Sequence, residues 1–276
     1  MKQVILTADD FGLSHAVNEA VEQAHRNGIL NTASLMIAGP AAADAVRRAR
    51  TMPGLRVGLH AVTIEGPAAL PGACPSLVSS IGQFPNDPAR LALQYAFSAR
   101  ARRQLRAELA AQFRAYKATS LPLDHVNAHK HMHLHPAVGA VLIAVGAEFN
   151  LRAIRIPAEP PATLAACGTA PTRAARALYA WTRLLRRQAT AAGLKTNDHC
   201  FGIAWSGHMT TDRLTTLAAN LPEGLTEIYF HPATTRDDRL NALMPTYEHA
   251  AELETLTSPA FRQALQQAQA TPATYT

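Results

Sequence analysis

Residues 3–12 read QVILTADDFG, an apolar run that ends in two adjacent aspartates. The run Gln3–Thr7 predicts a short β-strand, because aliphatic and β-branched side chains suit a pleated sheet. Asp9 and Asp10 then stand at the carboxyl end of that strand. A helix is expected next over Asn18–Gly28, where apolar residues recur at helical spacing and a glycine ends the pattern. The chain therefore begins with a strand, a polar turn and a helix.

This strand–helix unit recurs along the chain. Further strands are expected at Ala33–Ile37, Arg56–His60, Leu123–Val126, Ala153–Ile156, Cys200–Ala204 and Thr226–Phe230. Further helices are expected at Ala41–Arg50, 89–117, Pro136–Phe149, 172–192, 212–219 and 247–268. About seven alternations predict an α/β fold with a parallel sheet wound by helices, either a barrel or an open sheet. No internal repeat or low-complexity linker divides the chain, so we expect one domain over residues 1–276.

Residues 66–88 interrupt the alternation with a stretch that is rich in proline and glycine. A loop of this length is uncommon in a compact domain. We expect it to form a lid, a substrate loop or a surface excursion.

The composition is that of a globular protein, with 48% hydrophobic and 17% charged residues. Cys74, Cys167 and Cys200 show no CxxC spacing, so neither a disulfide framework nor a zinc–thiolate site is expected, and a reducing cytoplasmic compartment fits best. No signal peptide or membrane-spanning stretch is expected. The net charge of +6 comes from two segments, 90–117 with seven basic residues and one acid, and 173–195 with six basic residues and no acid.

Residues suited to metal binding and proton transfer stand at the ends of four predicted strands. Asp9 and Asp10 end the first strand, and His60 ends the third. A histidine cluster follows the fourth, and His231 ends the last. The active sites of barrels and open α/β sheets lie at the carboxyl edge of the strands. We therefore expect these residues to share one pocket.

The cluster is the segment 125–136, HVNAHKHMHLHP, which holds five of the 12 histidines of the chain. A helical backbone would place His129 and His133 on one face, whereas an extended backbone would point residues 129, 131, 133 and 135 in one direction. Pro136 favours the extended form for the residue before it, His135. We expect one or two of these histidines to bind metal and the others to contact substrate or to orient their neighbours.

Together these residues predict a metal-dependent hydrolase. Asp10, His60 and His129 supply three ligands for one divalent ion and leave a position for water. Asp9 is placed to take a proton from that water, and His231 to protonate a leaving group. Zinc and magnesium are the first candidate ions, with cobalt and nickel as alternatives. Two imidazoles suit zinc, cobalt or nickel, whereas magnesium prefers more oxygen ligands.

The sequence resembles the YdjC-like carbohydrate deacetylase family. The matching stretches are TADDFGLS at 7–14, GLH at 58–60, DHVNAHKHMHLHP at 124–136, IRIPAE at 154–159 and FHPA at 230–233. The resemblance implies a TIM-barrel-like fold with about seven strands, and a divalent metal used to remove acetyl groups from N-acetylated amino sugars. It implies the same metal ligands, base and acid as above. Carbohydrate members often have Asp-Ser where this chain has Asn127-Ala128, so we expect an amide to orient a neighbouring side chain there.

The stretches VNAHKHMHLHP and AWSGHMT, the latter at 204–210, resemble one branch of the family, the hopanoid biosynthesis-associated deacetylases. That branch implies an N-acetylglucosaminyl group on a hopanoid lipid as the substrate, with a chito-oligosaccharide as the alternative. His131, His133, Glu159 and Trp205 are expected to bind substrate. Arg155 is expected to orient the substrate or the aspartate pair, or to serve as a salt-bridged scaffold.

Residues 172–192 predict a basic amphipathic helix. Leu178, Trp181, Leu184 and Leu185 share one stripe, and arginines flank it. Such a helix would dock on an anionic membrane, or would pack on the barrel with its arginines in water. The first interpretation suits a lipid-linked substrate and places the protein in the cytoplasm, in peripheral contact with the inner membrane face. The family resemblance also allows a homodimer.

Three other functions stay open at this stage. A phosphoesterase or amidohydrolase on a similar barrel usually begins with an HxH motif, which the first strand lacks. A nucleic-acid-binding protein has only the net charge and two arginine-rich helices in its favour and no recognition motif, so we expect no nucleic-acid partner. A non-catalytic relative would be expected to lack a member of the Asp-Asp-His-His-His set, and this chain has all five.

Overall fold

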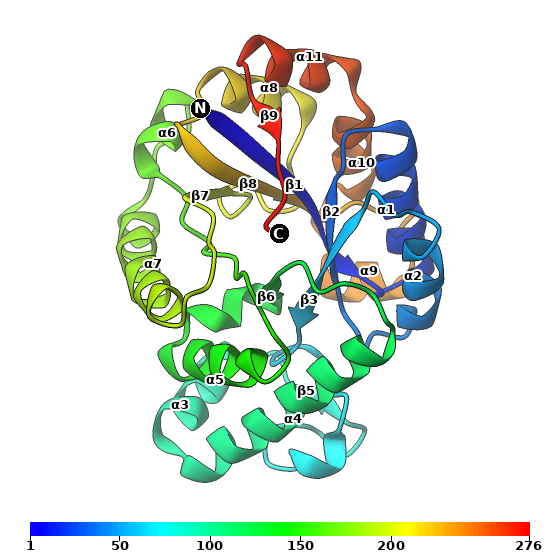
Figure 1. The fold of residues 1–276 in the computed structure, drawn as a ribbon, viewed down its shortest axis with the longest axis vertical. Helices are drawn as coiled ribbons and strands as arrows, with labels where there is room; N and C mark the ends of the chain where they lie inside the picture. The colour runs from blue at the N-terminus through cyan, green and yellow to red at the C-terminus, as the bar shows by residue number, and fades with distance from the viewer.

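The computed structural model describes all 276 residues, which form a curled sheet of parallel strands surrounded by helices (Figure 1). The strands are β1 (Lys2–Phe11), β2 (Thr32–Leu35), β3 (Arg56–Ala61), β4 (Gly66–Pro67), β5 (Gln83–Phe84), β6 (Val126–Ala128), β7 (His199–Phe201), β8 (Gly224–Phe230) and β9 (Thr271–Pro272). The α-helices are α1 (His15–Asn27), α2 (Ala42–Ala49), α3 (Pro88–Phe97), α4 (Ala99–Ala118), α5 (Pro136–Ala147), α6 (Pro161–Ala166), α7 (Arg173–Ala191), α8 (Thr211–Ala219), α9 (Asp238–Leu243), α10 (His249–Thr257) and α11 (Pro259–Gln267). Two 3-10 helices are η1 (Pro71–Ala73) and η2 (His129–Leu134). The helices lack any stretch with the length and apolar content that a bilayer crossing requires.

The main sheet is parallel throughout and curls into a barrel. Its strands run in the order β6-β3-β2-β1-β8-β7, and β9 pairs with β1. The expected TIM-barrel-like α/β fold with about seven parallel strands is confirmed. The expected strand at Ala153–Ile156 is wrong, because its residues form only isolated bridges, to Val126 on one side and to Lys195 on the other. The side chain of Asn197 replaces further ladder bonds there, since it bonds both the N–H and the C=O of Ile156.

β1 shows how the sheet separates two environments. Val4, Leu6 and Ala8 face a core of 61 buried residues that includes side chains from the strands and from the surrounding helices. Successive side chains of a strand point to opposite faces. Thr7 and Asp9 therefore point inside the barrel, where they meet charged side chains. The barrel thus has an apolar outer layer and a polar interior.

A serine divides each of two expected helices. The helix expected over 89–117 is α3 followed by α4, because Ser98 has an extended backbone (φ −103°, ψ 111°) and its hydroxyl accepts the N–H of Ala101 at 3.1 Å. The helix expected over 247–268 is α10 followed by α11, because Ser258 precedes Pro259 and a residue before proline disfavours the helical conformation.

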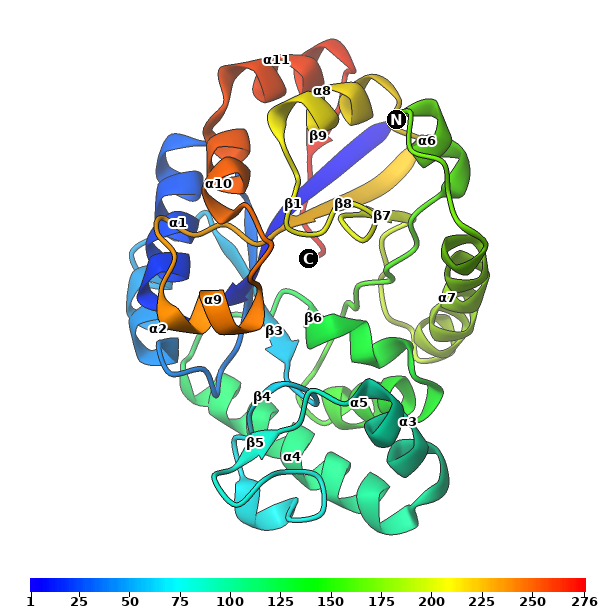
Figure 2. The same cartoon turned by 180° about the vertical axis from the view of Figure 1, so that it is seen from behind.

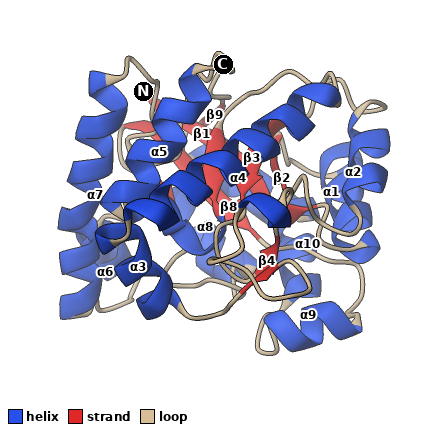
Figure 3. Ribbon diagram, turned by 90° about the horizontal axis from the view of Figure 1, so that it is seen from below, coloured by secondary structure: helices blue, strands red, loops and turns tan.

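Residues 66–88 contain the antiparallel pair β4–β5 and η1. Buried Glu108 of α4 anchors this segment, since its carboxylate accepts the N–H groups of Ala69 at 2.7 Å and Leu70 at 2.8 Å. The β4–β5 pair and α9 lie toward the viewer in Figure 2, and Figure 3 shows β4 and α9 on the side of the molecule opposite the two chain ends. A lid function for this segment stays a prediction.

Replacing Ser98 by alanine removes the side-chain acceptor at the start of α4. We expect the free energy of unfolding to fall by about 1 kcal/mol. The matched control is Ser80→Ala at an exposed turn position, which should change stability by less than about 0.5 kcal/mol. Chemical denaturation of both variants is the measurement, and equal stabilities would contradict the capping role of Ser98.

Candidate active site

The carboxyl ends of β1, β3, β6 and β8 meet at one cavity of about 270 Å³. Its wall includes Asp9, Asp10, His60, His129 and His231. The structure therefore brings together the residues that the strand order predicted to share a pocket.

Four residues of the cavity wall have a left-handed backbone, which is unfavourable for residues other than glycine. They are Asp10 (φ 62°), Glu65 (φ 42°), Lys130 (φ 50°) and His131 (φ 53°). At Asp10 the turn coincides with an irregularity in the pairing of β1 with β2. Neighbouring residues of a regular strand would point to opposite faces, so this turn is what brings the carboxylates of both Asp9 and Asp10 to the cavity.

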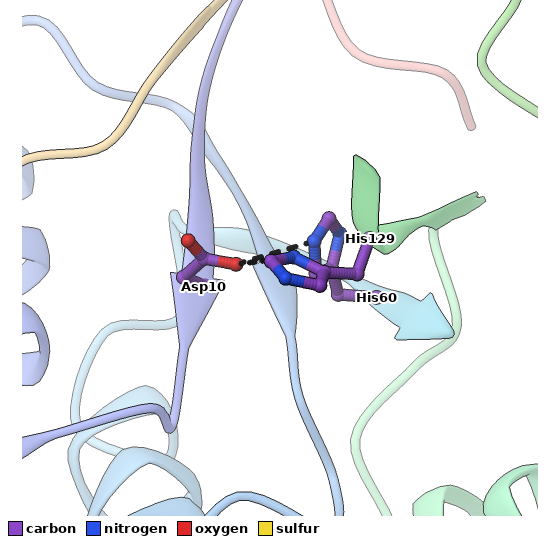
Figure 4. A group of neighbouring side chains, drawn as sticks. All are labelled: Asp10, His60 and His129. Carbon is purple, nitrogen blue, oxygen red and sulfur yellow. Dashed lines mark ion pairs between the residues drawn. The ribbon is translucent and has the colours of Figure 1, made fainter. Parts of the chain in front are cut away.

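Asp10, His60 and His129 point toward one another (Figure 4). Asp10 Oδ1 lies 3.3 Å from His60 Nε2 and 3.3 Å from His129 Nδ1, and one ligand atom of each residue lies within 4.8 Å of the others. Both carboxylate oxygens of Asp10 and the Nε2 of His60 are buried without a hydrogen-bond partner. Buried polar atoms are normally paired, so these atoms are oriented toward a further binder.

The spacing of these atoms suits a divalent cation. Ligand atoms about 2.0–2.2 Å from a tetrahedral zinc ion lie about 3.4 Å from one another. The separations of 3.3 Å from Asp10 Oδ1 to each of the two imidazole nitrogens agree with that geometry. Asp10, His60 and His129 could therefore hold one metal ion, and three protein ligands leave a position for water or substrate.

Opposite charges stabilise the ionised forms of Asp10 and His129. Burial opposes ionisation of Asp10, but the neighbouring imidazoles of His129 and His60 hold the pKa of its carboxyl well below its usual range. Burial also disfavours a charged His129, yet Asp10 and Glu65 raise its pKa to about 9. A cation would meet Asp10 as a carboxylate and would have to displace a proton from His129.

Asn127 fixes the ring of His60. Its Oδ1 accepts from His60 Nδ1 at 2.7 Å, and this contact directs Nε2 at Asp10. Its amide nitrogen donates to Asp9 Oδ1 and to Ser34 Oγ, both at 3.0 Å. The expectation that the amide of Asn127 orients a neighbouring side chain is confirmed.

Asp9 has a different partner from Asp10. Arg155 Nη1 donates to Asp9 Oδ2 at 2.5 Å, and Nη2 donates to Asp9 Oδ1 at 2.9 Å. The same guanidinium donates to Glu227 from Nε at 2.9 Å and from Nη2 at 2.8 Å. Burial opposes ionisation of Asp9, but Arg155 outweighs it and holds the pKa of Asp9 far below its usual range. Asp9 therefore borders the cavity as an ionised, firmly held carboxylate.

The backbone of the histidine segment is not extended. Residues His129–Leu134 form η2, which is kinked by the left-handed backbone of Lys130 and His131. The extended form predicted from Pro136 is correct for His135 alone (φ −70°, ψ 125°). The preceding residues curl instead, so their side chains diverge.

The four later histidines of the segment consequently have four different surroundings. His129 joins the candidate metal ligands, and His131 Nε2 lies on the cavity wall 2.9 Å from the hydroxyl of Tyr229. His133 turns to the backbone carbonyl of residue 155 at 3.1 Å. The ring of His135 packs against a tyrosine of α3, with ring centroids 6.1 Å apart.

Four residues expected to bind substrate lie outside the cavity wall. Arg155 is fully buried between Asp9 and a glutamate, as the orienting and scaffold interpretations predicted. His133 is buried beneath it. Glu159 accepts three consecutive backbone N–H groups at 202–204, and buried Trp205 donates its Nε1 to a threonine hydroxyl. None of the four lines the cavity, and His131 is the one expected substrate contact that does.

His231 follows β8, and its backbone is held from both sides. Glu252 accepts the N–H of His231 at 2.5 Å, and Nδ1 of His249 lies 2.6 Å from its carbonyl oxygen. The Nδ1 of His231 has no partner. Burial lowers the pKa of His231, and the nearby carboxylates only partly offset that effect. The imidazole is therefore neutral at pH 7.

Sequence reasoning missed Glu227, Glu252, Tyr229 and Tyr247. Glu227 had a signal, because a carboxylate in the apolar strand TEIYF needs a buried partner. Glu252 had none, since its helix also carries Glu254, which faces water. Tyr229 and Tyr247 line the cavity but read as ordinary core aromatics in the sequence.

Known proteins resemble this chain in sequence and in fold. A sequence model of the YdjC-like protein family matches residues 3–267. A carbohydrate deacetylase from Geobacillus stearothermophilus is 30% identical over 257 residues, which cover 92% of this chain and 89% of that protein. A chitooligosaccharide deacetylase from Serratia marcescens is 33% identical over 138 residues, 50% of this chain and 53% of that protein. The crystal structure of an Enterococcus faecalis V583 protein proposed to cleave cellobiose phosphate has a TM-score of 0.77 at 22% identity, covering 99% of this chain and 97% of that one, which shows a shared fold.

Asp10→Ala removes the oxygen that both histidines face. We expect Co²⁺ to bind this variant more than about 100-fold more weakly than the wild type, because loss of an orienting neighbour alone typically costs 10–100-fold. His135→Ala, from the same histidine segment but outside the three ligands, should leave affinity unchanged. Calorimetric titration of metal-free protein with Co²⁺ is the measurement, and equal affinity in Asp10→Ala and wild type would contradict the ligand assignment.

Glu252 makes stability depend on pH. Burial raises the pKa of Glu252 from 4.5 to about 7, although backbone N–H groups favour its charged form. The native state therefore binds more protons than the unfolded state between those values, so this group makes the free energy of unfolding fall as pH rises through that window. Glu252→Gln removes the titration, and urea unfolding at about pH 5, 6 and 7 should show a flatter dependence than in the wild type. Parallel curves would contradict the raised pKa.

Proposed function

The chain belongs to the YdjC-like protein family, and from that premise we propose that it is a metal-dependent hydrolase that removes the acetyl group from an N-acetylated amino sugar. The observation that carries the proposal is the division of labour between two adjacent aspartates. Asp10 has two unpaired carboxylate oxygens and faces His60 and His129, while Asp9 is held ionised by Arg155 beside them. His231 lies on the wall of the same cavity. Ligands, proton acceptor and proton donor are thus present together.

Asp10, His60 and His129 would hold the metal. A bound divalent cation would supply polarisation of the amide carbonyl and a lowered pKa for water. One carboxylate oxygen and two imidazole nitrogens favour zinc, cobalt or nickel over magnesium.

Asp9 acts as the general base in this proposal. Three hydrogen bonds, from Arg155 and Asn127, fix its carboxylate in one orientation at the cavity wall. A carboxylate whose pKa is held so low is ionised at every pH in the neutral range. It is therefore always in the form that can accept a proton from water, and as a weak base it passes that proton on readily.

His231 acts as the general acid. Its Nδ1 is free of other hydrogen bonds, and its backbone is held by Glu252 and His249. Because the imidazole is neutral at pH 7, it would first take up the proton that Asp9 has accepted from water, and its lowered pKa would let it release that proton readily. His231 would hand that proton to the departing amine, which leaves acetate and a free amino sugar.

For the substrate we propose an N-acetylglucosaminyl group linked to a hopanoid lipid, with chito-oligosaccharides as the second candidate. The lipid-linked substrate is supported by the stretches VNAHKHMHLHP and AWSGHMT. It is also supported by large apolar side chains that are exposed on α3 and α7, namely Leu93 (61% exposed), Phe97 (83%) and Trp181 (49%). The chito-oligosaccharide candidate is supported by the similarity to the Serratia marcescens protein.

The exposed faces of α3 and α7 fit peripheral contact with an anionic membrane. Arg173, Arg176, Arg183 and Arg187 of α7 are exposed beside Trp181. Leu185 is buried, so one side of the predicted apolar stripe packs on the barrel while Trp181 faces outward. A helix with this pattern can rest on lipid headgroups while the barrel stays in water.

The test is acetate release by Zn²⁺- or Co²⁺-loaded protein from an N-acetylglucosaminyl hopanoid and from a soluble chito-oligosaccharide. We expect release from the lipid-linked substrate. Asp9→Asn and His231→Ala should each lower kcat by about 10²–10⁴-fold, the usual contribution of acid–base catalysis, with metal affinity unchanged. His135→Ala is the control with normal turnover.

The outcomes separate the parts of the proposal. Release from the oligosaccharide alone would leave the deacetylase function and overturn the lipid-linked substrate. Normal turnover of His231→Ala would overturn the acid assignment. No acetate from either substrate, with metal fully bound, would overturn the deacetylase function.

A further inference from the structure

The chain segment after α11 enters the barrel from the end opposite the cavity. β9 pairs with β1 at Gln3 and Val4, and the backbone then continues inward. In Figure 1 the red end of the chain lies in the middle of the curled sheet, and Figure 3 shows that end on the side of the molecule opposite β4 and α9. The family model ends at residue 267, so this segment lies outside the matched part of the chain.

Tyr275 is the residue that fills the interior there. It is 2% exposed and packs with Ile5 and Ala153, apart from the main core. Its ring stacks on the imidazole of His125, with centroids 4.9 Å apart and an interplanar angle of 26°. Its hydroxyl lies 2.6 Å from Glu227 Oε2 and 3.0 Å from Asn197 Oδ1.

Glu227 links this hydroxyl to the catalytic side of the barrel. Its Oε2 accepts hydrogen bonds from the hydroxyl of Tyr275 and from Nε of Arg155. Its Oε1 accepts one from the hydroxyl of Thr7 at 2.6 Å. The other side of the Arg155 guanidinium holds Asp9. The guanidinium of Arg155 is therefore shared by two buried carboxylates. Of these two, only Glu227 also accepts hydrogen bonds from hydroxyl groups.

We propose that Tyr275 is a positioning residue for Asp9 and acts through Glu227 and Arg155. A hydrogen bond to a buried carboxylate offsets part of its charge. With the hydroxyl of Tyr275 in place, part of the charge of Glu227 is already offset, so Glu227 attracts Arg155 less strongly. The guanidinium can then keep both of its hydrogen bonds to Asp9. Without it, Arg155 is drawn toward Glu227 and Asp9 loses its fixed orientation. A test of this role by turnover rests on the proposed deacetylase function, whereas a test by the contact between Arg155 and Asp9 does not.

A residue that only fills space inside the barrel would behave differently. It would lower stability when the hydroxyl is lost and would leave the chemical step unchanged. Tyr116 offers a matched control, because it is also 2% exposed and its hydroxyl also makes two hydrogen bonds, to the carbonyls of Val57 at 2.7 Å and Pro122 at 3.1 Å. Neither of those partners belongs to the chain of contacts that reaches Asp9.

The experiment compares Tyr275→Phe with Tyr116→Phe in the metal-loaded enzyme. Both variants keep their ring, so both should fold and lose similar stability. We expect kcat of Tyr275→Phe to fall by about tenfold, which corresponds to a modest loss of transition-state stabilisation, with KM and metal affinity unchanged. Tyr116→Phe should keep the wild-type kcat. In a Glu227→Gln background, Tyr275→Phe should lower kcat by less than about twofold, because the relay is already broken.

A crystal structure of Tyr275→Phe gives a readout that does not depend on turnover. We expect the contact between Arg155 Nη1 and Asp9 Oδ2, 2.5 Å in the native chain, to open beyond hydrogen-bonding distance. An unchanged contact together with the same kcat in Tyr275→Phe and Tyr116→Phe would overturn the inference. A wild type inactive on every acetylated sugar would overturn the proposed function instead, and the crystal structure would still decide the role of Tyr275.

Discussion

The guanidinium of Arg155 lies inside the barrel between the carboxylates of Asp9 and Glu227, and the site is built around that contact. Two buried carboxylates cannot share so small a space without a cation, and loss of one member of a buried ion pair costs about 3–5 kcal/mol. The strands are therefore held by a polar interior as well as by the apolar layer under the helices. This arrangement also keeps Asp9 off the candidate metal ligands and leaves Asp10 to face His60 and His129.

Backbone strain shapes the cavity wall. The left-handed residues Asp10, Glu65, Lys130 and His131 all border the cavity, although such conformations are unfavourable. At Asp10 the left-handed backbone directs a second carboxylate into the cavity. A regular strand would direct only one of two neighbouring side chains there. Proteins tolerate strain of this kind where the surrounding structure determines it, and here the firmly paired strands on either side of β1 do so.

Much of the fold could be predicted from the sequence, because parallel strands that carry aliphatic runs and end in polar turns have a strong local signature. Asp9, Asp10, His60 and His231 each stand at a strand end, so their convergence followed from topology alone. The directions of His131 and His133 did not follow, since the left-handed turn in η2 depends on packing rather than on local preference. For Arg155 the sequence left a choice between substrate and scaffold, and for Glu159 it favoured the substrate, because a charged residue after a strand can point into a barrel or into a pocket and only its partner decides. Tyr275 gave no signal, because its partner Glu227 lies 48 residues away.

The most direct test of the account is the anomalous diffraction of crystals that have been saturated with Co²⁺ or Zn²⁺. We expect one peak about 2.0–2.2 Å from an oxygen of Asp10, Nε2 of His60 and Nδ1 of His129, with Asp9 still paired to Arg155. A metal ion ligated by Asp9, or no peak among the three ligands at saturation, would contradict the division of labour between the two aspartates.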